Sequence, residues 1–212
     1  MIYTPKPLEE LIEAGLVLVG ERTTIERGVE LCHPTRGGEQ LPVRIGDDCY
    51  IRSGTVIYSG VTVGNGCQTG HHAMIRENST LGNRTVVGTG AVVEFGTTLG
   101  DHVMIETQSY ITANVVVEDY VFVGPCVVTT NDKRMLWRRE GANQFLKGPT
   151  LRWGCRIGGG SVLLPGVEVG REAMIGAGAV VTKNIPARAI AFGNPATVTG
   201  EVSEEEGVVE VS

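Results

Sequence analysis

The chain has 212 residues, 42% of them hydrophobic, with a formal net charge of −6 and a pI near 5.3. This acidic balance argues against non-specific nucleic-acid binding, which needs Lys and Arg to displace counterions from phosphates. No apolar run approaches the ~20 residues that span a bilayer, and the N-terminal "MIYTPKPLEELIEAG" has acidic residues where a signal peptide has its apolar core. We therefore expect a cytoplasmic protein that binds neither nucleic acid nor membranes.

Two residue types constrain the architecture further. Glycine accounts for 30 residues, well above its usual share of about 7%, whereas aromatic residues make up only 5%. This composition favours thin, repeated layers over a core of large rings. The five cysteines are odd in number and lack Cys-x-x-Cys spacing, which argues against a disulfide framework and against a structural zinc site.

An aliphatic residue recurs every six positions along most of the chain. The pattern begins at Val19, Ile25 and Leu31, is interrupted at 32–44, and resumes at Ile45. From there the recurring positions are Ile45, Ile51, Ile57, Val63, Thr69, Ile75, Leu81, Val87, Val93, Leu99, Ile105, Ile111, Val117 and Val123. Thirteen of these fourteen are Ile, Leu or Val, and the residue four places later is always Cys, Thr, Val, Ala or Ser. Each repeat therefore has one large and one small inward site.

A six-residue period does not fit an α-helix, but it fits a short strand followed by a turn. Three such units close a triangle of 18 residues, and each strand then hydrogen-bonds in parallel to the strand one coil later, ~4.8 Å along the axis. Cys49 and Cys67, one coil apart, are then small core residues. The sequence predicts an all-β parallel β-helix of roughly eight coils, ~40 Å long at this strand spacing.

The second half of the chain contains one larger departure from the repeat. Between Val123 and Leu151 lie 28 residues, which is not a multiple of six, so a loop must leave the coil at about 130–148. The repeat resumes at Leu151, Ile157, Leu163, Val169, Ile175 and Val181. We expect a single β-helix domain over residues 1–198, and a flexible acidic tail over 199–212.

The repeats themselves resemble those of a known family. "IGDDCY", "VGNGCQ", "LGNRTV" and "IGAGAV", followed by "VVTKNIPARAIAFGNPA", resemble the hexapeptide-repeat acyltransferases over residues 19 to about 198. The resemblance implies a left-handed β-helix, an exception to the usual right-handed crossover. It also implies a homotrimer that binds acyl coenzyme A in grooves between neighbouring prisms.

Within that family, "GPCVVTTNDKR", the excursion after it and "GNPA" are most similar to N-acetyltransferases of nucleotide-linked amino sugars. Sugar O-acetyltransferases of the superfamily carry a histidine on this excursion. This chain has Asn131 and Asp132 at the corresponding positions. The departure favours an amine acceptor over a hydroxyl acceptor.

The segment "QTGHHAMIREN" (68–78) contains the one exception to the aliphatic pattern, Thr69, and two histidines that follow at or near a corner. Transfer to an amine needs an unprotonated nucleophile, and a histidine with a pKa of about 6.5 can accept the proton. We expect His72 to act as the general base, with His71 as the second candidate. Two structural alternatives remain open: both are surface residues at a corner, or one packs at the trimer seam.

A metal site is the next alternative, because some left-handed β-helix proteins are zinc-dependent carbonic anhydrases. Those enzymes combine one histidine with a His-x4-His pair on a later coil. The four histidines here, His33, His71, His72 and His102, contain no such pair, and the columns of His72 and His102 lie on different faces. We expect no bound metal.

The resemblance also implies positions for the two substrates. In the family a Gly-Ala-Gly backbone borders the pantetheine arm of acetyl coenzyme A and the following lysine approaches its phosphates, which indicates Gly176, Ala177 and Lys183 here. The excursion is basic, and a nucleotide sugar favours guanidinium and aromatic groups. We expect Asn131, Asp132 and Arg134 to contact the acceptor. The alternative is that Lys183 and the charged side chains of the loop are exposed to water and contact no substrate.

These observations predict an acetyl-coenzyme A-dependent N-acetyltransferase of a nucleotide-linked amino sugar, working by direct transfer between subunits of a homotrimer. An O-acetyltransferase acting on a simpler sugar or a serine-like acceptor is the first alternative. A non-enzymatic β-helix scaffold and a γ-type carbonic anhydrase-like protein are the others, since fold alone does not fix function.

Overall fold

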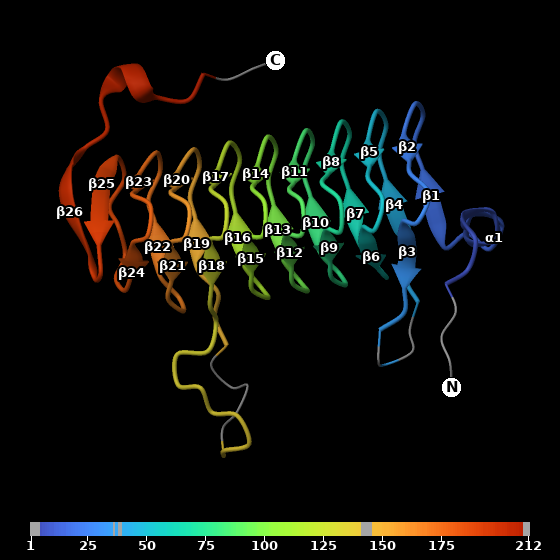
Figure 1. Cartoon of the computed structure of the whole chain (residues 1–212), viewed down its shortest axis with the longest axis horizontal. Helices are drawn as coiled ribbons and strands as arrows, with labels where there is room; N and C mark the ends of the chain where they lie inside the picture. Colours follow the sequence, from blue (N-terminus) through green and yellow to red (C-terminus); the bar gives the residue numbers. More distant parts are fainter. Residues whose placement is uncertain (1–4, 36, 38–39, 141–145, 210–212) are drawn as a thin grey trace.

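The protein is a straight triangular prism, seen in Figure 1 with its long axis horizontal. This computed structural model describes residues 5–35, 37, 40–140 and 146–209. The chain winds as a left-handed β-helix through eight coils of three strands each, β1–β3 to β22–β24. The predicted all-β parallel β-helix is confirmed.

Three parallel sheets form the walls. Sheet 1 contains β1 (Val17–Val19), β4 (Val43–Ile45), β7 (Thr62–Val63), β10 (Thr80–Leu81), β13 (Thr98–Leu99), β16 (Val116–Val117), β19 (Thr150–Leu151) and β22 (Glu168–Val169). Sheet 2 contains β2 (Thr24–Ile25), β5 (Tyr50–Ile51), β8 (Gln68–Thr69), β11 (Val86–Val87), β14 (Met104–Ile105), β17 (Phe122–Val123), β20 (Arg156–Ile157), β23 (Met174–Ile175), β25 (Ala189–Gly193) and β26 (Ala196–Glu201). Sheet 3 contains β3 (Glu30–His33), β6 (Val56–Tyr58), β9 (Met74–Ile75), β12 (Val92–Val93), β15 (Tyr110–Ile111), β18 (Val128–Thr129), β21 (Val162–Leu163) and β24 (Val180–Val181).

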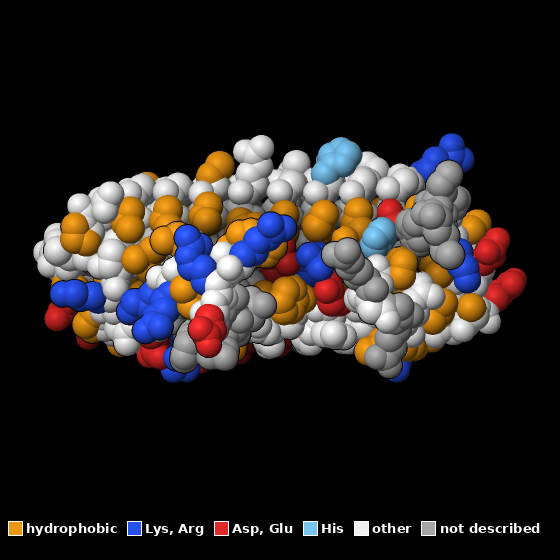
Figure 2. All heavy atoms as spheres, turned by 90° about the horizontal axis from the view of Figure 1, so that it is seen from below, with side chains coloured by type: hydrophobic (Ala, Val, Ile, Leu, Met, Phe, Trp, Pro, Cys, Tyr) orange, Lys and Arg blue, Asp and Glu red, His pale blue; other side chains and the backbone are white. Residues whose placement is uncertain are grey.

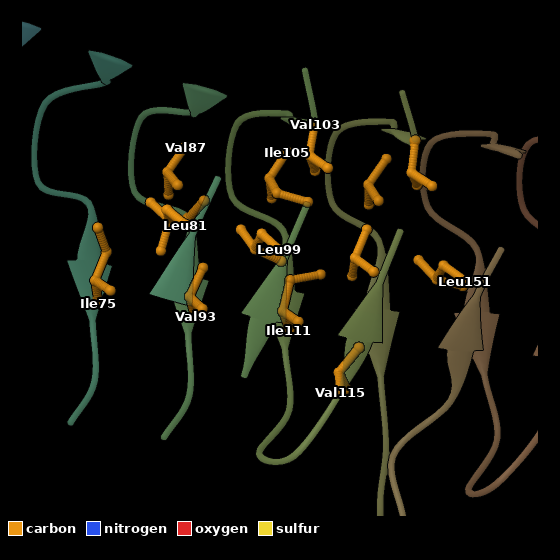
Figure 3. Packing of buried hydrophobic residues seen from close by; sticks show 14 of the residues in the cluster. Ile75, Leu81, Val87, Val93, Leu99, Val103, Ile105, Ile111, Val115 and Leu151 are labelled. Atoms are coloured by element: carbon orange, nitrogen blue, oxygen red, sulfur yellow. The ribbon is translucent and has the colours of Figure 1, made fainter. Parts of the chain in front are cut away.

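Residues eighteen apart pair directly within each wall. Val63 pairs with Leu81, and Leu81 pairs with Leu99. The same register carries across the large excursion, where Val117 pairs with Leu151. Figure 3 shows these aliphatic side chains pointing into the prism from successive coils. Both inward sites are buried from Ile45 to Val127, so the core consists of stacked columns, as the six-residue period predicts.

The corner between sheets 1 and 2, here called corner 1, explains the glycine that follows many inward residues. The Oδ1 atom of Asn65 accepts the N–H of Asp47, that of Asn83 accepts the N–H of Asn65, and that of Asp101 accepts the N–H of Asn83, at 2.6–2.9 Å. These side chains lie over the glycine of the preceding coil. A Cβ at Gly82 would collide with Asp101 and with the Gly100 backbone. Glycine is therefore required here by close approach, since its φ is not left-handed.

Two excursions leave the prism from corner 3, which joins sheet 3 to the next coil of sheet 1 (Figure 1). The large one runs from 130 to 149, between β18 and β19, which agrees with the predicted loop at about 130–148. The smaller one is shorter than the expected 32–44. Cys32 and His33 belong to β3, and Val43 and Arg44 belong to β4, because both strands extend by pairing with their neighbours.

A helix closes one end of the prism and a hairpin closes the other (Figure 1). At the N-terminus α1 (Leu8–Glu13), which the six-residue pattern did not predict, buries Leu11 against the first coil. At the other end β26 pairs antiparallel with β25. The boundary expected at residue 198 falls inside β26, Val202 is buried, and η1 (Glu204–Glu206) follows. Among the described residues, no helix is long and apolar enough to cross a membrane.

Replacing Gly82 with Ala tests the corner 1 contacts. The added methyl group must displace the Asp101 side chain, which should lower the free energy of unfolding by about 1–3 kcal/mol, the usual cost of overpacking. Gly200→Ala is the control, because no atom lies within 4 Å of a Cβ built there. Chemical denaturation of both variants measures the difference, and equal midpoints for Gly82→Ala and the wild type would refute this role for the glycine.

Candidate active site

The predicted histidines lie at corner 2, between sheets 2 and 3, in the third coil. Both are exposed. The His71 Nδ1 atom is 3.0 Å from the Ser53 hydroxyl oxygen and 4.0 Å from Glu26 Oε2. Because both contacts involve the same ring nitrogen, His71 does not bridge a nucleophile and a carboxylate as the histidine of a catalytic triad does.

His72 occupies the left-handed position of the same turn, with φ 57°. Its ring lies against Gly54 of the preceding coil, where a Cβ would overlap the imidazole. The position is glycine in several other coils, including Gly54 and Gly90. His72 is therefore held at the outer edge of the prism, and within one chain it faces solvent.

Thr69 has a structural role in the coil. Its hydroxyl is 3.0 Å from the Thr55 hydroxyl and accepts the N–H of Arg52 at 2.9 Å, inside the prism. The Arg52 guanidinium also donates to the Thr69 carbonyl at 2.8 Å. The same replacement occurs at Thr129, which is buried and accepts the N–H of Thr112 at 2.7 Å. Polar contacts thus replace aliphatic ones at two inward sites, one in sheet 2 and one in sheet 3.

A groove of about 520 Å³ lies beneath the large excursion, at the junction of sheet 3 and corner 3. It is lined by Tyr110, Thr112, Val128, Thr129, Thr130, Asn131, Asp132, Lys133, Met135, Leu164, Pro165 and Thr182. Four successive coils contribute to its floor, through strands β15 and β18 and through the residues that follow β21 and β24, and the excursion forms one side. Its surface combines an aliphatic and aromatic floor with hydroxyl, amide and charged groups at the rim. This combination is usual for small-molecule sites.

Asp132 organises the first turn of the excursion. Its carboxylate accepts the backbone N–H groups of Arg134, Met135 and Leu136 at 2.9, 2.7 and 3.2 Å. At the base of the loop the Lys147 N–H donates to the Asn131 carbonyl at 2.9 Å, which ties the two ends together. Asn131 and Asp132 both line the groove, as expected for acceptor contacts, but the Asp132 carboxylate is already engaged by the loop backbone.

Cations gather beside the groove. A smaller hollow of about 290 Å³ is lined by Lys133, Arg134 and Lys147, with Pro165 and Gly166. It shares Lys133 and Pro165 with the larger groove. Blue side chains accordingly cluster around the excursion in Figure 2. Three positive side chains around one hollow form a site suited to phosphate.

The residues of the last coil that are expected to bind acetyl coenzyme A lie at two different corners. Gly176 and Ala177 lie in the turn after β23 at corner 2, whereas Lys183 follows β24 at corner 3. Gly176 has a packing role, because a Cβ there would overlap the ring of Phe192 in β25. Lys183 is exposed and follows Thr182, which lines the groove.

One chain therefore brings together only part of the predicted site. Asn131, Asp132 and Arg134 surround the groove and its hollow, and Lys183 is next in sequence to a lining residue. His71 and His72 lie at another corner, three coils from the excursion, which is ~14 Å along the axis. Sequence reasoning missed Lys147 and the groove floor, although Thr129 repeats the polar exception seen at Thr69.

A second groove, also about 520 Å³, lies along corner 1 near the C-terminal end. Its charged groups satisfy one another. The Arg152 guanidinium donates to Glu118 at 2.8 Å and to Glu168 at 2.7 Å, and Arg171 stacks 3.7 Å from the centre of the Trp153 ring. Burial opposes ionisation of Glu118, but Arg152 and the Trp153 N–H outweigh it and lower the pKa of the carboxyl. This network stabilises the corner and leaves little charge for a ligand.

The histidine at corner 1 also has a structural environment. The His102 ring stacks on Tyr120 with a centroid distance of 4.7 Å and an interplanar angle of 5°. Throughout the described parts of the chain, no three His, Cys, Asp or Glu side chains come close enough together to hold a metal ion.

The sequence matches two families of hexapeptide repeats. Residues 42–76, 96–131 and 154–183 match the bacterial transferase hexapeptide (six repeats), and residues 78–113 match the hexapeptide repeat of succinyl-transferase. The chain belongs to the hexapeptide-repeat transferase family. The predicted family is thereby confirmed.

Curated relatives of this hexapeptide-repeat transferase have varied acceptors. The chain is 38% identical over 69 residues to a galactoside O-acetyltransferase of Lactococcus lactis, covering 32% of this chain and 33% of that one. It is 49% identical over 51 residues to a dTDP-3-amino-3,6-dideoxy-alpha-D-galactopyranose 3-N-acetyltransferase of Aneurinibacillus thermoaerophilus, covering 24% and 27%. The match thus spans about a third or less of these relatives.

Solved structures of similar fold superimpose on a larger share of the chain than these sequence matches cover. LpxA, a UDP-N-acetylglucosamine acyltransferase from Bacteroides fragilis, superimposes with a TM-score of 0.70 at 16% identity, covering 88% of this chain and 71% of that one. A putative acetyltransferase from Bacillus cereus gives 0.58 at 23%, covering 84% and 87%. A hexapeptide-repeat acetyltransferase from Vibrio cholerae, solved with acetyl coenzyme A, gives 0.51 at 25%, covering 58% and 71%.

Asp132→Ala should loosen the excursion without affecting the coils. Three N–H groups lose a charged acceptor, and such hydrogen bonds contribute about 1.5–3 kcal/mol each, so amide exchange at residues 134–136 should accelerate about tenfold or more. Hydrogen exchange followed by mass spectrometry measures this. Glu140→Ala, the same charge change in the same loop, is the control. Unchanged exchange in Asp132→Ala would contradict the assigned role.

Proposed function

We propose that this chain is an acetyl-coenzyme A-dependent N-acetyltransferase acting on a nucleotide-linked amino sugar. The observation that carries the proposal is the groove beneath the excursion, which joins an apolar floor to a hollow lined by three cations. Both co-substrates of such a reaction combine phosphate groups with uncharged parts, and the groove provides surfaces for each. The family and its acetyltransferase members support the same reaction class.

The acyl donor fits the groove floor. Val128, Leu164 and Pro165 offer the apolar contacts that a pantetheine arm and an acetyl group require. Lys133, Arg134 and Lys147 surround the adjoining hollow, where a pyrophosphate or nucleotide phosphate can be neutralised. The family resemblance assigns three residues of the last coil to the acyl donor, and we propose the same role for them here: Lys183, Gly176 and Ala177.

The reaction is a direct transfer. The unprotonated amine of the acceptor bonds to the thioester carbonyl carbon, the carbon–sulfur bond breaks, and the departing thiolate is protonated. The amine proton passes to a base, for which His72 stays our candidate and His71 the second. Because His72 lies at corner 2 and faces solvent, it can serve only a groove on a neighbouring chain. A backbone N–H near the groove stabilises the oxyanion.

The acceptor proposal rests on Asn131 and Asp132, which stand at the groove where sugar O-acetyltransferases of this family carry a histidine. The relative from Aneurinibacillus thermoaerophilus acts on a dTDP-linked amino sugar, and it has the higher identity over its matched segment. The galactoside O-acetyltransferase of Lactococcus lactis supports the second candidate, transfer to a sugar hydroxyl. We propose that the protein works in the cytoplasm, with its soluble co-substrates.

A homotrimer would complete the site. The outward residues of sheet 3 form an uninterrupted apolar stripe of Val56, Met74, Val92, Tyr110, Val128, Val162 and Val180. The three outward residues of sheet 1 from Thr62 to Thr98 are all threonine. An apolar stripe of this extent marks a protein interface. It also borders the groove, through Tyr110 and Val128, so a second chain packed there could bring His72 to the acceptor.

An acceptor panel tests the reaction. UDP- and dTDP-linked amino sugars, galactosides and serine are offered with acetyl coenzyme A, and released thiol is measured. We expect turnover with at least one nucleotide-linked amino sugar and kcat/KM at least about 100-fold lower for the hydroxyl acceptors, since a site built for one polar group rejects its analogue strongly. Turnover with galactosides or serine alone would overturn the N-acetyltransferase assignment in favour of the second candidate.

His72→Ala tests the base. A positioned general base contributes about 10²–10⁴-fold to the rate, so kcat should fall at least tenfold while the KM for acetyl coenzyme A stays within about threefold. His102→Ala, at corner 1, is the control and should retain full activity. A wild-type kcat for His72→Ala would exclude this histidine as the base.

Val92→Glu tests the trimer. A carboxylate in the middle of the apolar stripe should be buried unpaired in the interface, so the variant should be a monomer by light scattering and lose activity. Thr98→Glu, an outward residue of sheet 1, should leave both the mass and the activity unchanged. A trimeric Val92→Glu, or a monomeric wild type, would argue against this face as the interface.

A further inference from the structure

A chain of contacts runs along sheet 3 and corner 3 from the first coil to the groove. His33 packs on Tyr58 with a centroid distance of 4.6 Å, and Arg76 lies 4.8 Å from the centre of the Tyr58 ring. Arg76 pairs with Glu94 at 3.2 Å, and the Tyr110 hydroxyl is 3.4 Å from Glu94 Oε1. Tyr110 lines the groove. These contacts place a carboxylate at the N-terminal end of the proposed donor site.

Glu94 differs from the other acidic partner of Arg76. Glu77 takes the short, forked contacts of the guanidinium, at 2.7 and 3.0 Å, whereas Glu94 holds only the longer ones to Arg76 and Tyr110. Both side chains are 18% exposed. A carboxylate offers about four lone-pair sites, so Glu94 retains acceptor capacity next to the groove. Burial and then the Glu94 charge raise the pKa of Tyr110, which keeps its hydroxyl as a donor.

The surroundings of the groove are electrically polarised. Glu94 contacts Tyr110 at one end of the groove. Lys133, Arg134 and Lys147 line the hollow at the other end, where the Asp132 carboxylate is held by three loop N–H groups. Glu94 follows β12 and Thr130 follows β18, two strands further along sheet 3, which is ~10 Å. A nucleotide-linked amino sugar has the complementary arrangement, because its amino group and its diphosphate attach to one sugar ring at separate carbons. A hydroxyl acceptor lacks the positive end.

We propose that Glu94 holds the amino group of the acceptor and so selects an amino sugar over its hydroxyl counterpart. The inference rests on the proposed function and deepens it. Arg76 and Tyr110 position the carboxylate, and Glu94 accepts hydrogen bonds from the ammonium or amine N–H groups at the mouth of the groove. The proton is removed afterwards by the base, so Glu94 itself acts on binding and selectivity.

Calorimetry with purified full-length protein tests this directly. The ligands are the amino sugar nucleotide with the highest kcat/KM in the acceptor panel and the nucleotide sugar that carries a hydroxyl at the same carbon. Wild-type protein should bind the amino compound at least tenfold more tightly. Glu94→Gln, which keeps the size of the side chain, should lose that preference, with an unchanged Kd for the hydroxyl compound and for coenzyme A.

Glu77→Gln is the matched control, because it removes an equally buried carboxylate from the same arginine. It should keep the preference for the amine and a KM within about threefold of wild type. A wild-type preference in Glu94→Gln, or an equal loss in Glu77→Gln, would overturn the role of Glu94 alone. Should Glu94→Gln misfold, as judged by loss of coenzyme A binding, Glu94→Asp must weaken amine binding or the inference fails. Absence of turnover with every amino sugar would overturn the proposed function as well.

Discussion

Backbone hydrogen bonds between strands of successive coils, whose facing residues are eighteen apart, determine what every other part of this molecule can do. Each wall strand donates to and accepts from its neighbours in the coils above and below, so the three walls must keep one length throughout. A residue added within a wall would break the register of every later coil. Additional chain can therefore leave only at a corner, and both excursions do so at corner 3.

This constraint concentrates chemistry at the places where the coil is interrupted. The interior admits one large and one small side chain per repeat, and even its polar members, such as Thr55 and Thr69, are used in internal hydrogen bonds. The groove forms where the large excursion folds back over sheet 3, with its turn held by Asp132 and its neck by Asn131. A rigid wall beneath a fixed loop gives a site whose floor does not need to reorganise when a ligand binds.

The architecture was predictable because the period is encoded locally. Each inward aliphatic residue predicts the next one six places on, and the 28-residue interval between Val123 and Leu151 indicates the excursion because it is not a multiple of six. The groove was less accessible to such reasoning. Its floor draws Tyr110, Leu164 and Thr182 from different coils, and only the handedness and the path of the excursion decide which corner they share. Likewise α1 precedes the first repeat, so the six-residue pattern does not predict it.

The roles of the histidines show the same limit. Their position at a corner followed from the repeat, but the distance to the excursion depends on which corner and which coil each occupies. The contact between Glu94 and Tyr110 joins residues 16 apart, nearly one coil, and is visible only when the walls are stacked. In this fold, functional residues are therefore identified by their stacking along the prism more than by their proximity in the sequence.

The most direct test of the account is a crystal structure of the protein with coenzyme A. We predict that the pantetheine arm lies in the groove lined by Tyr110, Thr129 and Leu164, with phosphate near Lys133 and Lys147. Coenzyme A bound instead along corner 1, beside Trp153, would contradict the assignment of the active site.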